Sequence, residues 1–187
     1  MKLKFVVSLV GLAFLFDAAA QAQERQVIDV GVTYSYVRYN PATSGIKSFS
    51  MNGGSGSVAV NFKSWLSGVA DIGGYSKHDI LGNGVSGSLS TYLFGPRVSL
   101  NRYGRFTPFG QVLVGIAHTG GRYLTTGGSQ TPFATAIGGG LDWRLTDHIR
   151  VRSGEVDYLL THFAEVNNRN TRVQNNLRVS SGLIFRF

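Results

Sequence analysis

The chain has 187 residues, of which 43% are hydrophobic and 15% are charged, and it contains no cysteine. This length suits one domain, and the lack of cysteine excludes disulfides and thiolate sites. The formal net charge of +8 at pH 7 favours anionic neighbours. Nucleic acid is not expected among them, because the sequence has no compact run of lysine and arginine.

The first 22 residues have the layout of a cleavable secretory signal peptide. A basic start at residues 1–4 precedes an almost unbroken apolar run from Phe5 to Phe16, and Ala20 and Ala22 form the small-x-small site that signal peptidase needs. A retained membrane helix needs about 20 apolar residues, more than this run supplies. We therefore expect cleavage after Ala22, export through the periplasm, and one domain over residues 23–187.

Beyond the signal peptide, no apolar stretch is long enough for a membrane helix. Val112 to Ala117 is about the longest. A secreted membrane protein without such a helix is a closed barrel or a peripheral protein, because lipid leaves no partner for unpaired backbone groups. The rest of the chain consists of segments in which apolar and polar residues alternate, which predicts β-strands.

The first three alternating segments predict three strands. Val27 to Tyr39 alternates almost perfectly, and Ser57 to Phe62 alternates again. Between them, the Gly-, Ser- and Asn-rich stretch from Asn40 to Gly56 predicts a flexible loop. Leu66 to Lys77 is the third strand, and its many small residues obscure which face is apolar. Asp71 is assigned to the interior.

The next three predicted strands are separated by a tight turn and a loop. Pro96 removes a ladder hydrogen bond, so it fits best near a strand end or a bulge. In chain order the segments are a loop at His78 to Gly87, a strand at Leu89 to Leu100, a tight turn at Asn101 to Arg105, a strand at Thr107 to Ala117, a loop at His118 to Gln130 and a strand at Thr131 to Leu145.

The seventh segment, Ile149 to His162, changes its alternation partway along. A β-bulge near Ser153 and Gly154 explains the change, because one extra residue restores the apolar positions to the same face. Thr161 to Gln174 is polar and Asn-rich and predicts a fourth long loop. Short turns thus alternate with long loops, which is typical of a barrel with periplasmic turns and extracellular loops.

The last strand alternates up to a terminal phenylalanine. Its apolar positions are Leu177, Val179, Leu183, Phe185 and Phe187, and its polar face carries Arg178, Ser180, Gly182 and Arg186. Gly182, Phe185 and Phe187 fit the carboxy-terminal signal by which such barrels reach their assembly machinery. We predict an all-β fold, an eight-stranded antiparallel up-and-down transmembrane β-barrel, in the outer membrane of a Gram-negative bacterium.

A longer segment supports this class at residue level. Gly138 to Arg152, with Glu155 to Tyr158 after it, resembles the corresponding hairpin of OmpA-like barrels. By layout the resemblance covers Val27 to Phe187. It implies an eight-stranded barrel with a role in envelope integrity, surface interaction or slight, porin-like permeability. The chain stops at the barrel, so tethering to the cell wall through a periplasmic domain is not expected.

Charged residues on the inner faces predict a plugged lumen. An eight-stranded barrel is just wide enough for its own side chains, and an unpaired charge inside it costs several kcal/mol. We expect Arg186 near Asp29, with Arg152 and Glu155 beside Asp142 and Arg178. A gated pore whose ion pairs exchange partners is the alternative. The full set is Asp29, Asp71, Arg97, Asp142, Arg144, Arg150, Arg152, Glu155, Asp157, Arg178 and Arg186.

The histidines do not suggest an enzyme or a metal site. Three of the four end non-adjacent strands, and no short motif joins a histidine to a serine nucleophile and an acid. We therefore expect no catalytic residue, no metal and no cofactor, with a lipid-modifying enzyme as a less favoured alternative. The four are His78, His118, His148 and His162.

The expected partners follow from this location. They are outer-membrane lipids and lipopolysaccharide, with the barrel assembly machinery and periplasmic chaperones during biogenesis. The loops are weakly basic and favour adhesion-type contacts, so we expect a monomer with a structural and surface-interaction role in the cell envelope. Their basic residues are Lys47, Lys77, Arg122, Arg169 and Arg172.

Overall fold

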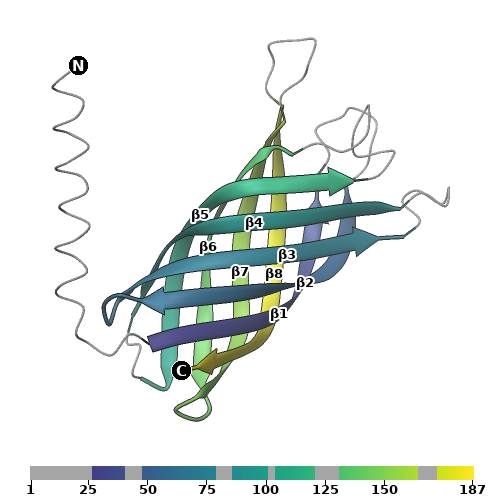
Figure 1. Ribbon diagram of the computed structural model, residues 1–187. Coiled ribbons are helices and arrows are strands. Elements are labelled where there is room, and N and C mark those ends of the chain that lie inside the picture. The colour runs from purple at the N-terminus through teal and green to yellow at the C-terminus, as the bar shows by residue number, and fades with distance from the viewer. Residues whose placement is uncertain (1–26, 41–47, 79–85, 101–103, 121–130, 164–171) are drawn as a thin grey trace, which may run out of the picture.

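Eight antiparallel strands form a closed barrel in the computed structural model, each paired with its neighbours in the chain and β1 paired with β8 (Figure 1). The structure describes residues 27–40, 48–78, 86–100, 104–120, 131–163 and 172–187. Within these ranges no helix is long and apolar enough to cross a membrane. The strands are β1 (Val27–Tyr39), β2 (Phe49–Asn61), β3 (Leu66–Lys77), β4 (Gly87–Ser99), β5 (Phe106–Gly120), β6 (Phe133–Arg144), β7 (Ile149–Phe163) and β8 (Arg172–Arg186).

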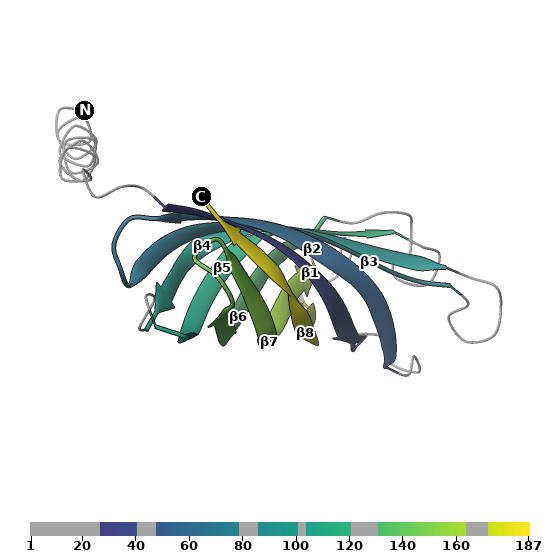
Figure 2. The ribbon, with the colours of Figure 1, turned by 90° about the horizontal axis from the view of Figure 1, so that it is seen from below.

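The two ends of the barrel differ. At the end called here the turn end, β2 joins β3, β4 joins β5 and β6 joins β7, and the opposite end is the loop end. The start of β1 meets the end of β8 at the turn end, where Phe187 N donates to Ile28 O at 2.9 Å. Figure 2 shows the carboxy-terminal end of β8 beside the start of β1. The barrel therefore closes between its first and last strands.

The distribution of side chains is inverted relative to a water-soluble protein. Large apolar side chains cover the outside, and Tyr34 is 64% exposed. Polar and charged side chains fill much of the inside, where Arg178 is 1% exposed. Because strand side chains alternate between faces, this places a lipid-compatible surface outside and a polar interior inside.

The predicted bounds hold for two strands and differ by a few residues for others. β1 and β3 have the predicted bounds, and β5 and β7 run slightly further toward the loop end than predicted. Pro96 lies inside β4, three residues before its end, and its pairing opposite Gly68 involves no register shift. Of the two predicted placements, the proline therefore lies near a strand end and not at a bulge.

The expectation of a loop over Asn40 to Gly56 is wrong from Phe49 onward. β2 already begins at Phe49 and pairs residue by residue with β1, as in Tyr34 opposite Gly54. Glycine and serine have low intrinsic strand propensity, but ladders to β1 and β3 on both sides outweigh that preference. At Gly53 an added Cβ would lie 2.7 Å from Tyr75 Cα, so the close approach of β2 to β3 requires glycine there.

The predicted β-bulge is confirmed. Leu141 pairs with Gly154 and the next residue, Asp142, pairs with Arg152, which leaves Ser153 as the extra residue. Ser153 Oγ donates to Leu141 O at 3.0 Å. Because of this bulge Arg152 and Glu155 both point into the lumen, although they are three positions apart and would face opposite sides of a regular strand.

Some expectations lie outside the described residues. These are the signal peptide over residues 1–22, with Ala20 and Ala22, and parts of the four predicted loops and of the turn at 101–105. Among the described histidines, His78 Nδ1 lies 3.1 Å from Ser86 Oγ and His118 Nδ1 lies 3.0 Å from Thr131 Oγ1.

Candidate functional site

The lumen is filled by three successive layers of side chains. A charged layer occupies the middle, an apolar layer lies on its loop-end side, and a turn-end layer closes the other side. The charged layer consists of Asp71, Arg97, Phe109, Gln111, Asp142, Arg152, Glu155, Asp157 and Arg178. The apolar layer consists mainly of Val37, Tyr39, Phe49, Met51, Leu89, Leu113 and Leu159. The turn-end layer contains Asp29, Asn61, Ser67, Thr107, Arg150 and Arg186.

Arg178 joins β8 to both β3 and β7. Its Nη1 lies 2.7 Å from Asp71 Oδ1 and donates to Tyr75 Oη at 3.0 Å. Its Nε and Nη2 donate to Asp157 Oδ2 at 3.0 and 2.8 Å, and Nη2 is 3.6 Å from Glu155 Oε1. A planar guanidinium can donate in several directions at once, so one arginine serves three acids on two strands.

Arg152 is the second buried cation of the charged layer. Its Nε and Nη2 donate to Asp142 Oδ1 and Oδ2 at 2.9 and 3.2 Å, a bidentate pair, and its Nη1 pairs with Glu155. The Arg152 guanidinium carbon also lies 4.5 Å from the centroid of the Phe109 ring. The bulge at Ser153 is what allows Arg152 and Glu155 to share one face of β7.

Arg97 connects to the acids through a glutamine. Its Nε and Nη2 donate to Gln111 Oε1 at 3.0 and 2.7 Å. Gln111 Nε2 donates in turn to Glu155 Oε1 at 2.8 Å and to Asp157 Oδ1 at 3.1 Å. Gln111 therefore links the arginine of β4 to the acids of β7 and completes the hydrogen bonding of the layer.

The turn-end layer contains the pair that closes the barrel. Arg186 Nε and Nη2 donate to Asp29 Oδ1 and Oδ2 at 2.7 and 2.9 Å, joining β8 to β1. Asn61 Nδ2 donates to Asp29 Oδ2 at 3.1 Å and to Val27 O at 2.7 Å. Arg150 is buried in the same layer and donates to Thr107 Oγ1 at 3.1 Å.

The apolar layer seals the loop-end side. Val37, Met51, Leu89 and Leu113 are all fully buried, and the Tyr39 and Phe49 rings pack with centroids 5.1 Å apart. These residues come from β1, β2, β4 and β5, and Leu159 of β7 joins them from the opposite side of the wall. The layer places mainly hydrocarbon between the charged layer and the loop end, although Thr119 and Asn176, which pair with Leu89 and Leu159, are also fully buried there.

The sequence matches the family model of the outer membrane protein beta-barrel domain over residues 7–185. The chain belongs to this outer-membrane β-barrel family. The closed eight-stranded architecture agrees with that membership. The protein is therefore an outer-membrane β-barrel protein of the Gram-negative type.

Solved structures of outer-membrane barrels have the same fold. Neisserial surface protein A aligns with a TM-score of 0.63 at 13% identity, over 86% of this chain and 97% of that chain. Ail, the attachment invasion locus protein of Yersinia pestis, gives 0.59 at 13% identity, over 87% and 99%. OprG of Pseudomonas aeruginosa gives 0.57 at 11% identity, over 89% and 98%. A search of the curated proteins gave no match.

Ten of the eleven charged residues expected in the lumen of this outer-membrane protein lie in it, and Arg144 does not. Its Nη1 lies 3.9 Å from Asp147 Oδ1, and its side chain is 37% exposed. Arg144 is the last residue of β6, so its side chain extends past the rim of the barrel. Strand alternation predicts whether a side chain points into the lumen only for residues within the wall of the barrel.

Three parts of the site were not predicted. Phe109 and Gln111 lie on the inner face of β5, and their alternation with outward-facing residues was the available signal. The apolar layer was missed because the interior was expected to be polar and because Phe49 and Met51 fell in the predicted loop. In the described part of the chain, no three His, Cys, Asp or Glu side chains are placed to hold a metal ion.

Proposed function

We propose that this outer-membrane barrel has a closed lumen and serves a structural and surface-interaction role. It contributes to envelope integrity and presents its loops for adhesion-type contacts. The observation that carries the proposal is the succession of layers in the lumen. Arg152 and Arg178 are 2% and 1% exposed between the apolar layer and the turn-end layer.

The layers oppose conduction for two different reasons. An ion crossing the charged layer has to displace side chains that already neutralise one another at hydrogen-bond distance. An ion crossing the apolar layer has to shed its water among fully buried side chains such as Leu89 and Leu113, and hydrophobic constrictions of this kind close pores by dewetting. Catalysis is not part of the proposal.

Planar-bilayer recording of the purified barrel tests closure. We expect no stable conductance, and sustained nanosiemens steps would support the alternative of a gated pore. The exchange of partners that such a pore needs has a basis in Arg178, which contacts three acids. Leu113→Ala, which thins the apolar layer, is expected to admit brief leak events, and Val112→Ala on the outer face of the same strand is the matched control.

Lipopolysaccharide is the proposed partner at the loop end. Arg38 lies on the outer face of β1, exposed, and donates to Ser48 Oγ at 2.6 Å and to Ser50 Oγ at 3.4 Å. An exposed cation beside hydroxyl groups at that height suits the phosphates of an anionic glycolipid. Ail has been crystallised with the heparin analogue sucrose octasulfate, and we extend contact with anionic saccharides to this chain as part of the proposal.

The loops can be tested by a deletion that respects β2. Because β2 begins at Phe49, the deletion is restricted to residues 41–47 so that the wall of the barrel stays intact. We expect weaker adhesion of cells or greater detergent sensitivity in the deletion strain. Unchanged phenotypes, with normal heat-modifiable gel mobility, would remove this loop from the proposed role.

We propose that the assembly machinery recognises the carboxy-terminal residues after periplasmic chaperones have delivered the chain. Phe185 and Phe187 are 37% and 75% exposed on the outer face. Gly182 packs so closely on Thr33 of β1 that an added Cβ would lie 2.6 Å from the Thr33 Cα. The exposed phenylalanines support recognition before the last strand closes, and the barrel is proposed to act as a monomer.

A further inference from the structure

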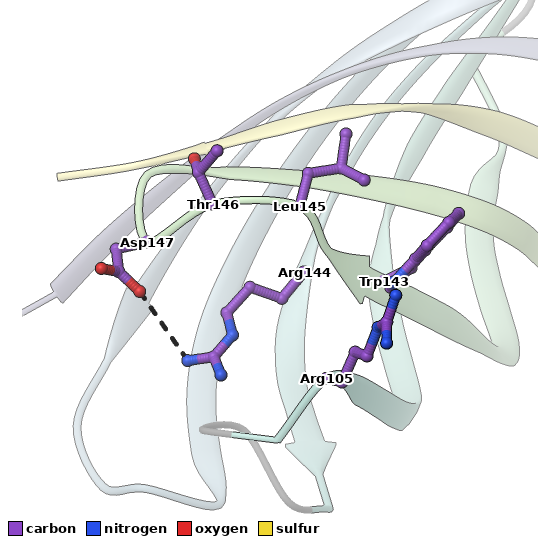
Figure 3. A pocket seen from close by; sticks show the side chains of 6 residues that line it. All are labelled: Arg105, Trp143, Arg144, Leu145, Thr146 and Asp147. Carbon is purple, nitrogen blue, oxygen red and sulfur yellow. Dashed lines mark ion pairs between the residues drawn. The ribbon is translucent and has the colours of Figure 1, made fainter.

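An open pocket of about 520 Å³ lies on the rim of the turn end, outside the lumen layers. Figure 3 shows its side chains, which come from the residue just before β5, the end of β6 and the turn that follows β6. The role proposed above uses none of them. They are Arg105, Trp143, Arg144, Leu145, Thr146 and Asp147.

Two arginines line this pocket, one beside Trp143 and the other beside Asp147, and their backbones are hydrogen-bonded (Figure 3). The Arg105 guanidinium carbon lies 5.8 Å from the centroid of the Trp143 ring, a cation–π contact, and Arg144 N donates to Arg105 O at 2.9 Å. Arg144 Nη1 lies 3.9 Å from Asp147 Oδ1. This ion pair is long and solvent-exposed, so it can give way to another anion.

The pocket adjoins an apolar surface on the outside of the barrel. The Phe106 and Trp143 rings stack with centroids 6.2 Å apart and an interplanar angle of 22°. Phe106 and Leu145 are each 52% exposed, and in a membrane these positions lie where acyl chains meet headgroups. Two cations beside such a surface suit an anionic group that carries acyl chains, which a free phosphate does not.

Asp147 limits which headgroups fit the pocket. Its side chain is 89% exposed beside Arg144, so it disfavours a headgroup that carries only negative charge. A primary ammonium a few bonds from the phosphate would instead donate to this carboxylate. A quaternary ammonium has no N–H and cannot do so.

We propose that this pocket binds the headgroup of a phosphoethanolamine lipid. Arg105 and Arg144 donate to the phosphate, Asp147 accepts from the ammonium, and the acyl chains lie along Phe106 and Leu145. The proposal needs the barrel to be in a membrane, but it does not depend on whether the lumen conducts. It assigns a lipid site to the turn end, separate from the lipopolysaccharide contact proposed for the loop end.

Tryptophan quenching by brominated lipid tests the proposal in vesicles of phosphatidylcholine. Trp65→Phe leaves Trp143 as the reporter, and Trp143→Phe leaves Trp65, which is 48% exposed in the β2–β3 turn at the same end. Brominated phosphatidylethanolamine is expected to replace phosphatidylcholine beside Trp143 about fivefold more readily than beside Trp65. Equal quenching of the two reporters would overturn the site.

Charge variants in the Trp65→Phe background test the phosphate contact and the ammonium contact independently. Arg105→Gln with Arg144→Gln is expected to abolish the preference, and its retention would overturn the phosphate contact. Asp147→Asn is expected to shift the preference toward brominated phosphatidylglycerol, and an unchanged order of lipids would overturn the ammonium contact. Heat-modifiable gel mobility confirms that each variant is folded.

A soluble headgroup distinguishes a lipid site from a site for a small water-soluble anion. Glycerophosphoethanolamine is added to the Trp65→Phe barrel in vesicles containing the brominated lipid. We expect quenching to persist at millimolar concentration, because the soluble compound has no acyl chains to lie along Phe106 and Leu145. Full reversal of the quenching would assign the pocket to a soluble ligand.

Discussion

Arg178 on β8 donates to Asp71 on β3 across the lumen, with Nη1 2.7 Å from Oδ1, although 107 positions separate the two residues in the chain. The same guanidinium contacts Asp157 and Glu155 on β7. One side chain thus ties together strands from different sides of the wall. The contact with Asp71 is a brace across the lumen between strands that no backbone ladder joins, since ladders connect only adjacent strands.

Removing this brace is expected to destabilise the barrel strongly. Arg178→Met leaves three buried carboxylates without their shared cation, and breaking buried pairs in this way costs about 3–5 kcal/mol. Urea unfolding of the barrel in lipid vesicles measures the loss. Arg144→Met is the control, because this exposed arginine is expected to contribute at most about 1 kcal/mol. Equal losses for the two variants would contradict the lumen network.

The pair between Asp29 and Arg186 is expected to stabilise the seam between β1 and β8. Arg186→Gln removes a bidentate contact at 2.7 and 2.9 Å, and we expect a loss of about 1.5–3 kcal/mol, the range for hydrogen bonds to charged groups. A double-mutant cycle with Asp29→Asn measures the coupling of the two side chains. Additive losses would mean that the seam is held by its backbone ladder alone.

Two glycines that face opposite sides of the wall should respond differently to alanine. An added Cβ at Gly53 would meet β3 at Tyr75 Cα, whereas at Gly74 nothing lies within 4 Å. Gly53→Ala is expected to cost about 1–3 kcal/mol through strain. Gly74→Ala should be neutral or stabilising by up to about 1 kcal/mol, since alanine loses less entropy on folding. The midpoint of urea unfolding compares the two, and similar shifts would contradict the close approach at Gly53.

The apolar layer should behave as a packed core. Leu113 is fully buried, and Leu113→Ala is expected to cost about 2–5 kcal/mol by leaving a cavity. Val112→Ala removes only two methyl groups, from a side chain on the outer face. The decrease in the free energy of unfolding should therefore be smaller than for Leu113→Ala. Unfolding in vesicles distinguishes them, and a larger effect at Val112 would mean that the lumen at this height is loosely packed.

Some elements of the barrel were predictable from the sequence and others were not. The bulge at Ser153 was predictable because a single extra residue changes the alternation of a strand in a visible way. β2 was not, since its glycines and serines have weak strand propensity, and its pairing depends on β1 and β3 on either side. The seam pair of Asp29 and Arg186 followed from parity and chain closure together.

Other parts of the site depend on distances that a sequence does not contain. Alternation placed Arg97 inside, but only the diameter and register of the barrel bring it to Gln111 and not to a carboxylate. The same geometry lets Arg178 reach β3, and it carries Arg144 beyond the rim to Asp147.

The sequence by itself determined the class of protein, the number of strands and the face on which most charges lie. It could do so because alternation is a local property, and each strand carries it independently of its partners. Only the tertiary structure decided which charges meet, where hydrocarbon seals the lumen and where the rim leaves a pocket. Those features arise when strands distant in sequence are brought to fixed heights around one narrow cylinder, because height and diameter are properties of the closed sheet and not of any one strand.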